Sequence, residues 1–242
     1  MHTKNTKRRF YEYEGSFKVR FSGKFWEKRY HNGREKIIEE ILHNELKKCD
    51  CEFILDAGCG TGEMAKILNT LGKKVVGLDI SSTYLKRSKE YIKILVNGDM
   101  ESLPFKSEAF DLVFCADALE HTQDFDQAVN ELFRVGKKCI LVTTPNEGLL
   151  RQIFRAGATS KLKQIDLKVG HNHIFSLHQL CNRLSKNGWI IAYHRTFHVI
   201  QPITDKILPP QLEKIIFNLE RIANVVLPNL GTVSAVLLCQ KR

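Results

Sequence analysis

The chain runs Ile54-Leu55-Asp56-Ala57-Gly58-Cys59-Gly60-Thr61-Gly62 through the stretch that decides its fold. The apolar start of this stretch predicts a buried strand, its glycines predict a loop, and the residues after it predict a helix. Because glycine has no Cβ, such a loop lets a ligand lie directly on the backbone. The following helix would present free N–H groups and a positive dipole end to a carboxylate or phosphate. A bound cofactor is therefore expected at this loop.

The spacing of the glycines and the acid before them distinguish between two classes of cofactor. Dinucleotides prefer G-x-G-x-x-G and place their pyrophosphate at the helix N-terminus, whereas this loop reads G-x-G-x-G and follows Asp56. A carboxylate at that place would repel a pyrophosphate and attract an ammonium group. S-adenosylmethionine carries an ammonium group, and a carboxylate for the helix end. The loop therefore favours S-adenosylmethionine and disfavours a nicotinamide oxidoreductase.

Three further strands are expected after the loop, each followed by polar residues. The first, Lys74–Leu78, leads into Asp79. An acid about twenty residues past a glycine loop, at the tip of the second strand, can accept two hydrogen bonds from a ribose. Asp79 is also suited to capping the helix after Ser81, and the two roles can coexist. The other two strands are Ile94–Val96, followed by Asp99 and Pro104, and Phe110–Cys115, followed by Leu119-Glu120-His121.

In this order, the segments resemble motifs of the class I S-adenosylmethionine-dependent methyltransferases, in the type-11 group of small-molecule enzymes. The resembled motifs are LDxGCGTG at residues 55–62, GDxExLPF at 98–105 and FDxVxxxxxLEH at 110–121. The resemblance implies S-adenosylmethionine as cofactor and S-adenosylhomocysteine as product. It also implies an α/β, Rossmann-like, doubly wound fold. We expect a seven-stranded, mostly parallel sheet with helices on both faces and a substrate-covering lid.

The resemblance assigns cofactor contacts to all four loops. In the family, the acid that Asp99 matches meets the adenine amino group, and the next backbone N–H, here that of Met100, meets a ring nitrogen. Cys59 is expected to fill space beneath the cofactor. The expected cofactor-binding residues are Asp56, Gly58, Cys59, Gly60, Gly62, Asp79, Ile80, Asp99, Met100 and Ala116.

Histidines supply the candidate catalytic groups. Methyl transfer from a sulfonium needs an aligned nucleophile and a dry site, and a hydroxyl or amine acceptor must also lose a proton. His121 ends the LEH segment, and His171 lies where a basic segment rejoins the core. Each is predicted to act as base, acid or substrate ligand, with a structural role as the alternative. His173 is expected to be structural, because it precedes the helix cap Ser176. His171 and His173 form a His-x-His pattern with no third ligand at a recognisable spacing, so no metal is expected.

Alternating strands and helices over residues 49–146 predict a parallel sheet that binds its ligand outside the carboxyl ends of the strands. A single domain is expected. Its parts are residues 1–48 (a basic, aromatic cap and the first helix), 49–146 (the cofactor-binding core), 147–175 (a basic lid insertion) and 176–242 (the C-terminal part of the core with a helical excursion).

The net charge of +10 is concentrated outside the core. Residues 1–36 carry eleven Lys or Arg against four acids, and residues 148–170 carry five against one. Clustered positive charge favours an anionic partner. The 7 cysteines, several within apolar runs, and the lack of a secretory signal or membrane-spanning run predict a reduced, cytoplasmic protein without disulfides.

The favoured function is transfer of a methyl group to a small, anionic or lipid-like acceptor. Residues 115–118 read Cys-Ala-Asp-Ala where enzymes that methylate exocyclic amino groups carry Asn-Pro-Pro-Tyr, which favours O- or C-methylation. An RNA methyltransferase is one alternative, but the chain has no recognisable RNA-binding module, so no nucleic-acid partner is expected. A non-catalytic cofactor-binding module is the other alternative. The sequence indicates no oligomeric state.

Overall fold

A computed structural model of the chain describes residues 35–36, 38–44, 50–148, 170–185, 188–197, 215, 218–219, 222–223, 226, 231 and 233–240. Seven strands form one sheet in the order β3-β2-β1-β4-β5-β7-β6. The strands are β1 (Phe53–Ala57), β2 (Lys74–Asp79), β3 (Ile94–Asn97), β4 (Phe110–Ala116), β5 (Gly136–Pro145), β6 (Trp189–Phe197) and β7 (Val233–Gln240).

The sheet is mostly parallel, as the sequence predicts. Strands β1 to β5 pair in parallel, and β7 is antiparallel to both of its neighbours, β5 and β6. The strand order reverses beside β1, where the chain moves from β3 on one side of the sheet to β4 on the other. Because the carboxyl ends of the parallel strands meet at one edge, the loops after β1, β2, β3 and β4 are brought together there.

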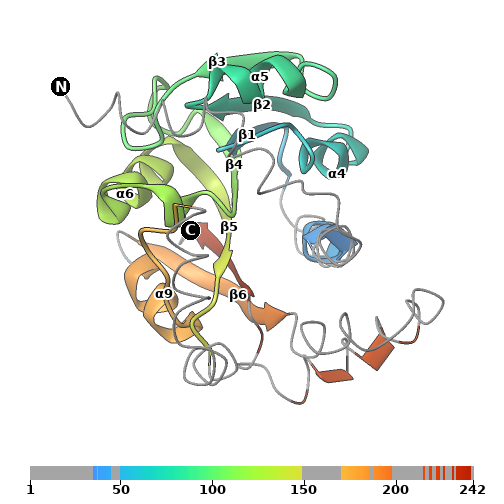
Figure 1. The fold of residues 1–242 in the computed structure, drawn as a ribbon, viewed down its shortest axis with the longest axis vertical. Helices are drawn as coiled ribbons and strands as arrows, with labels where there is room; N and C mark the ends of the chain where they lie inside the picture. Colours follow the sequence, from blue (N-terminus) through green and yellow to red (C-terminus); the bar gives the residue numbers. More distant parts are fainter. Residues whose placement is uncertain are drawn as a thin grey trace.

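Helices cover both faces of the sheet (Figure 1). On one face lie α4 (Ala65–Thr70), α5 (Ser82–Ser88) and the helical residues 38–44, and on the other lie α6 (Phe125–Val135) and α9 (Leu177–Leu184). A short 3-10 helix, η1 (Leu119–His121), follows β4. None of the helices formed by the described residues is long and apolar enough to cross a membrane.

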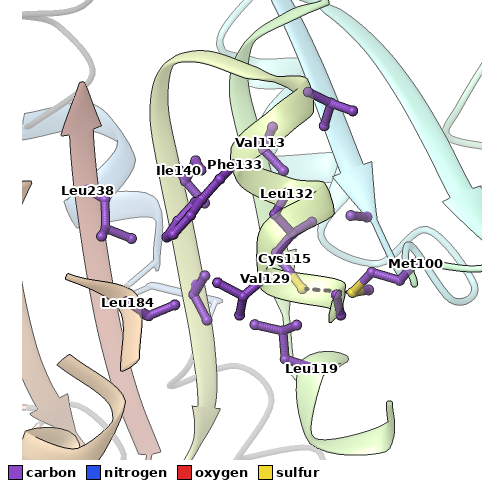
Figure 2. Close-up of a cluster of buried hydrophobic side chains, with 14 of the residues drawn as sticks. Met100, Val113, Cys115, Leu119, Val129, Leu132, Phe133, Ile140, Leu184 and Leu238 are labelled. Carbon is purple, nitrogen blue, oxygen red and sulfur yellow. Dashed lines mark hydrogen bonds between the residues drawn. The ribbon is translucent and has the colours of Figure 1, made fainter. Parts of the chain in front are cut away.

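Successive side chains of the central strands point to opposite faces of the sheet and pack into two separate hydrophobic cores. In β4, Val113 and Cys115 point toward α6 and α9, whereas Leu112 and Phe114 point toward α4. Figure 2 shows the first of these cores, in which Cys115 Sγ lies 3.8 Å from Met100 Sδ. The period of two in a strand buried on both faces explains why β4 is nearly all apolar.

The observed boundaries differ from the expected ones by a few residues. The sequence predicts a fifth strand from Cys139, but β5 begins at Gly136 because α6 runs directly into the strand without a loop. It also predicts a helix over residues 82–91, whereas α5 ends at Ser88. Most of the expected cap, residues 1–34, and most of the expected lid, residues 149–169, lie outside the described residues, and so does most of the helical excursion predicted at 212–226.

The capping box that begins α9 provides a test of local stability. Ser176 Oγ accepts the Gln179 N–H at 3.3 Å, and Gln179 Oε1 accepts the Ser176 N–H at 3.0 Å. We expect Ser176→Ala to lower the free energy of unfolding by about 1 kcal/mol, measured by urea denaturation. Ser185→Ala, at the other end of the same helix, is the control and should change it by less than about 0.5 kcal/mol. Equal effects of the two substitutions would contradict the role of the box.

Candidate cofactor site

An open pocket lies at the carboxyl edge of the sheet. It is built by the loops after four neighbouring strands, which contribute Gly58, Asp79, Asp99 and Asp117. Among the described residues, its lining is Gly58, Leu78, Asp79, Ile80, Tyr84, Gly98, Asp99, Met100, Asp117, Ala118, His121 and Thr122. The topology of the sheet thus gathers residues that are up to 64 positions apart in the sequence, from Gly58 to Thr122.

Hydrogen bonds join the glycine loop to the end of β2. The N–H groups of Gly58 and Cys59 donate to the Leu78 carbonyl at 2.7 and 3.0 Å, and the Gly60 N–H donates to Asp79 Oδ2 at 2.8 Å. Gly58, Gly60 and Gly62 adopt positive φ angles of 78°, 55° and 83°. The sequence predicts a loop and helix end with free N–H groups. Instead, these three loop N–H groups are engaged by β2, and α4 begins only at Ala65.

Asp79 holds the loop and faces the pocket. Its Oδ1 accepts the Ser81 N–H at 2.8 Å, while its Oδ2 accepts that of Gly60. The cap of α5 is Ser81, whose hydroxyl accepts the Tyr84 N–H at 3.3 Å, so the alternative of Asp79 as the helix cap is wrong. Each carboxylate oxygen accepts about two hydrogen bonds. Asp79 can therefore hold the loop and still accept the hydroxyls of a ribose.

Asp99 and Met100 also line the pocket. Asp99 Oδ1 accepts the Glu101 N–H at 3.0 Å, which fixes the carboxylate in a tight turn after β3. The Met100 side chain is buried and reaches toward Gly58, where its Cε would lie 3.2 Å from an added Cβ. An apolar wall beside two carboxylates suits a flat, hydrogen-bonding base attached to a sugar.

Asp56 is a buried carboxylate beneath this edge. It is 2% exposed, and within the described part of the chain its Oδ2 has no hydrogen-bond partner. Burial, and then the charge of Asp79, raise the pKa of Asp56 from its ordinary 3.8 to about 7. A buried carboxylate that lacks a partner is costly when ionised, and an ammonium group would remove that cost. Its chemistry fits the ammonium end of S-adenosylmethionine.

The raised pKa of Asp56 has a defined effect on folding. Because the folded state binds this proton more tightly than the unfolded state, its contribution to stability is fully present below about pH 4 and is lost as the pH rises toward 7. A bound ammonium group would act in the opposite direction, because it favours the ionised carboxylate.

Cofactor affinity should therefore depend on pH through Asp56. We expect the affinity for S-adenosylhomocysteine, measured by calorimetry, to fall roughly tenfold or more from about pH 7.5 to about pH 5.5. The Asp56→Asn variant should bind with nearly constant affinity over this range. If the native protein also showed constant affinity, Asp56 would not be the partner of the ammonium group.

The structure brings together about half of the predicted site residues. Gly58, Asp79, Ile80, Asp99, Met100 and His121 line the pocket, whereas Asp56, Cys59, Gly60, Gly62 and Ala116 do not. The Cys59 side chain packs with Ala65, Leu85 and Ile92, so it fills space behind the loop, and burial raises the pKa of its thiol. Ala116 is the last residue of β4 and packs against the core on the α4 side.

Sequence reasoning missed six lining residues, Leu78, Tyr84, Gly98, Asp117, Ala118 and Thr122. Asp117 has a φ of 48°, unusual for a residue other than glycine, and its Oδ1 accepts the Thr143 hydroxyl at 3.0 Å. The only available signal was position, since 117 and 118 directly follow β4 at the ligand edge.

The two candidate catalytic histidines lie together beside the pocket. The rings of His121 and His171 are 5.0 Å apart, and His121 Nδ1 lies 3.0 Å from the Gly170 carbonyl oxygen. Glu120, which is 1% exposed, places Oε1 4.0 Å from His121 Nε2. His173 Nε2 instead lies 3.1 Å from the Gln123 carbonyl oxygen, and its ring meets Phe125 edge-on and stacks on Phe175, as a structural residue would.

Comparisons with known proteins show which proteins the chain is similar to. Residues 55–139 match the methyltransferase domain family. The uncharacterized protein MJ0638 of Methanocaldococcus jannaschii is 32% identical over 190 residues, which cover 74% of each chain. Malonyl-[acyl-carrier protein] O-methyltransferase of Yersinia pestis is 33% identical over 107 residues, which cover 43% of this chain and 40% of that protein. The chain spans about half, or less, of the length of the curated relatives that it matches first.

A solved structure shows the same fold over nearly the whole chain. Magnesium protoporphyrin IX methyltransferase from Synechocystis PCC 6803, with bound S-adenosylhomocysteine, superposes with a TM-score of 0.65 at 15% identity, covering 98% of this chain and 99% of that one. At such low identity this likeness shows the fold, whereas the sequence matches show the family. The chain belongs to the class I S-adenosylmethionine-dependent methyltransferases, within the type-11 methyltransferase domain family.

Proposed function

We propose that the protein transfers a methyl group from S-adenosylmethionine to an oxygen or carbon of a small-molecule acceptor. The observation that carries this proposal is one pocket lined both by the carboxylates Asp79 and Asp99 and by His121. The carboxylates suit the nucleoside half of the cofactor, and the histidine suits an acceptor that must lose a proton.

The cofactor would supply an already activated methyl group, so the chain's own residues mainly bind and orient. Asp79 and Asp99 would hold the ribose and the adenine, Asp56 the ammonium group, and the Met100 side chain would exclude water from one side. The backbone of Gly58 and Gly60 would lie against the methionine half, where glycine permits close approach. Together these residues would hold the cofactor in the pocket that His121 also lines.

The hydrogen bond of His121 fixes which of its ring nitrogens can react. A carbonyl oxygen only accepts, so Nδ1 must carry the proton that is shared with Gly170. In the neutral ring, Nε2 then keeps its lone pair. This nitrogen, with His171 beside it, supports an acceptor whose hydroxyl or acidic carbon becomes an anion before the methyl group is transferred.

Two observations support an anionic acceptor and transfer to oxygen. The net charge of +10 gathers in residues 1–36 and 148–170, outside the cofactor core, and would attract an anion. The relative from Yersinia pestis is named for O-methylation of malonyl-[acyl-carrier protein], a carboxylate substrate. We also propose that the enzyme is cytoplasmic, because the six cysteines that the structure describes are all free thiols and a reducing compartment keeps thiols in this state.

The test is a methylation assay on a metabolite extract with isotopically labelled cofactor, followed by mass spectrometry of the product. A labelled small molecule whose formation needs His121 would support the proposal. Label recovered in RNA would favour the RNA methyltransferase alternative. Calorimetric binding of S-adenosylhomocysteine without transfer to any acceptor would favour a non-catalytic module.

A further inference from the structure

Three potential metal ligands meet beside the cofactor pocket, and neither the sequence nor the family match assigns them that role. One carboxylate oxygen of Glu120 and one ring nitrogen each of His121 and His171 all lie within 4.8 Å of one another. Glu120 is almost fully buried, and the two histidines are half-buried. The cluster therefore places a carboxylate and two imidazoles around one point at the border of the pocket.

The orientation of His121 is that of a metal ligand. Histidines that bind metals usually donate their other ring N–H to a carbonyl or carboxylate, which fixes the tautomer and the plane of the ring. His121 Nδ1 donates to the Gly170 carbonyl at 3.0 Å, and its Nε2 faces Glu120 Oε1 at 4.0 Å. The lone pair of Nε2 is thus directed toward the centre of the cluster.

Backbone hydrogen bonds hold the two contributing segments together. The Glu120 carbonyl accepts the N–H groups of Asn172 and His173 at 2.7 and 3.1 Å. The side-chain amide of Asn172 donates to the carbonyls of His121 and Thr122 at 3.3 and 3.1 Å. His171 is therefore held beside η1 although it is 50 residues from His121 in the sequence. Such a fixed arrangement lowers the cost of bringing ligands to one ion.

We propose that Glu120, His121 and His171 bind a divalent transition-metal ion such as Zn²⁺, Fe²⁺ or Mn²⁺. Two imidazoles and one carboxylate are a donor set that these ions favour, and three protein ligands leave coordination positions open. Ligand distances of about 2.1 Å would require the three donor atoms to be roughly 3.0 to 3.5 Å apart. The three donor atoms now lie within 4.8 Å of one another, so binding an ion would require the side chains to rotate and draw these atoms closer together.

This site deepens the proposed function and rests on it for its role in the reaction. The lone pair of His121 Nε2 can hold a proton or a metal ion, but not both. In this proposal, His121 and His171 are ligands rather than bases, and the open positions take an oxygen of the acceptor. A divalent ion would lower the pKa of a bound hydroxyl so that its proton passes to water, and it would stabilise the resulting oxygen anion without a protein base. The substrate class is then an acceptor with a hydroxyl, enolate or carboxylate oxygen.

The test measures Co²⁺ binding by its visible absorption, with the full chain freed of metal by a chelator. We expect the native protein to bind one ion with a spectrum of nitrogen and oxygen ligands. Glu120→Gln and His171→Asn should each weaken Co²⁺ binding about 100-fold or more. The matched control is His173→Asn, which changes a histidine of the same segment that lies outside the cluster and should leave Co²⁺ affinity within about threefold.

Parallel calorimetry with S-adenosylhomocysteine separates this proposal from the function on which it rests. Asp79→Ala should lose cofactor affinity and keep the Co²⁺ spectrum, and Glu120→Gln should do the reverse. No Co²⁺ binding by the native protein, equal binding by Glu120→Gln and His171→Asn, or thiolate bands in the spectrum would each overturn the metal site. If the native protein did not bind S-adenosylhomocysteine, the proposed function would be overturned instead.

Discussion

Replacing Asp79 with alanine is expected to weaken the binding of S-adenosylhomocysteine about 100-fold, as measured by calorimetry. Hydrogen bonds to a charged group are worth about 1.5 to 3 kcal/mol each, and the substitution removes those that the ribose would make. It also frees the N–H groups of Gly60 and Ser81, which Asp79 now accepts at 2.8 Å each. The substitution would thus remove both the hydrogen bond between the glycine loop and the end of β2 and the contact between Asp79 and the ribose.

Asp111 provides a matched control on the opposite edge of the sheet. Its Oδ2 accepts two backbone N–H groups, of Glu52 and Phe53, at 2.9 and 3.2 Å, near the amino ends of β1 and β4. Asp111→Ala should therefore lower the free energy of unfolding, as Asp79→Ala does, because both leave backbone donors without their carboxylate. Only Asp79→Ala should change cofactor affinity. An equal loss of affinity in both variants would mean that Asp79 acts through stability alone.

The sheet and its ligand edge were predictable because they depend on local patterns. Apolar runs such as residues 110–116, separated by helices, indicate a buried parallel sheet whatever the rest of the chain does. The family resemblance predicts a mostly parallel sheet of seven strands, but the place of the antiparallel β7 between β5 and β6 was not predicted. The register of strands more than 40 residues apart, such as β5 and β7, depends on packing that no local signal carries.

The cofactor half of the site was predictable for a similar reason, and the acceptor half was not. Asp79 is the last residue of β2 and Asp99 lies two residues after β3, so their place at the ligand edge follows from the topology. The cluster of Glu120, His121 and His171 depends instead on a contact between segments about fifty residues apart, which backbone hydrogen bonds such as Asn172 to Glu120 create. The sequence shows His-x-His without a third ligand, and therefore predicts no metal, because Glu120 and His121 enter the cluster only through the fold.

Substitutions at Gly58 and Gly60 should both abolish cofactor binding but lower the stability of the protein by different amounts. Comparing the two variants tests whether the cofactor lies against this loop. A Cβ added at Gly58 would lie 2.4 Å from Ala118 Cβ, which has no freedom to move away, at a φ of 78°. Gly58→Ala should therefore lower the free energy of unfolding by about 2 to 4 kcal/mol and abolish binding of S-adenosylhomocysteine.

At Gly60 an added Cβ would meet nothing within 4 Å, and only the φ of 55° opposes it. Gly60→Val should cost about 1 to 2 kcal/mol of stability through this strain, yet still abolish binding, because the side chain projects into space that the methionine half of the cofactor would occupy. Chemical denaturation and calorimetry of both variants separate the two effects. If Gly60→Val folded and bound normally, the cofactor would not lie against this loop, and the contacts assigned to Asp56 would fail with it, since both place the methionine half at the same turn.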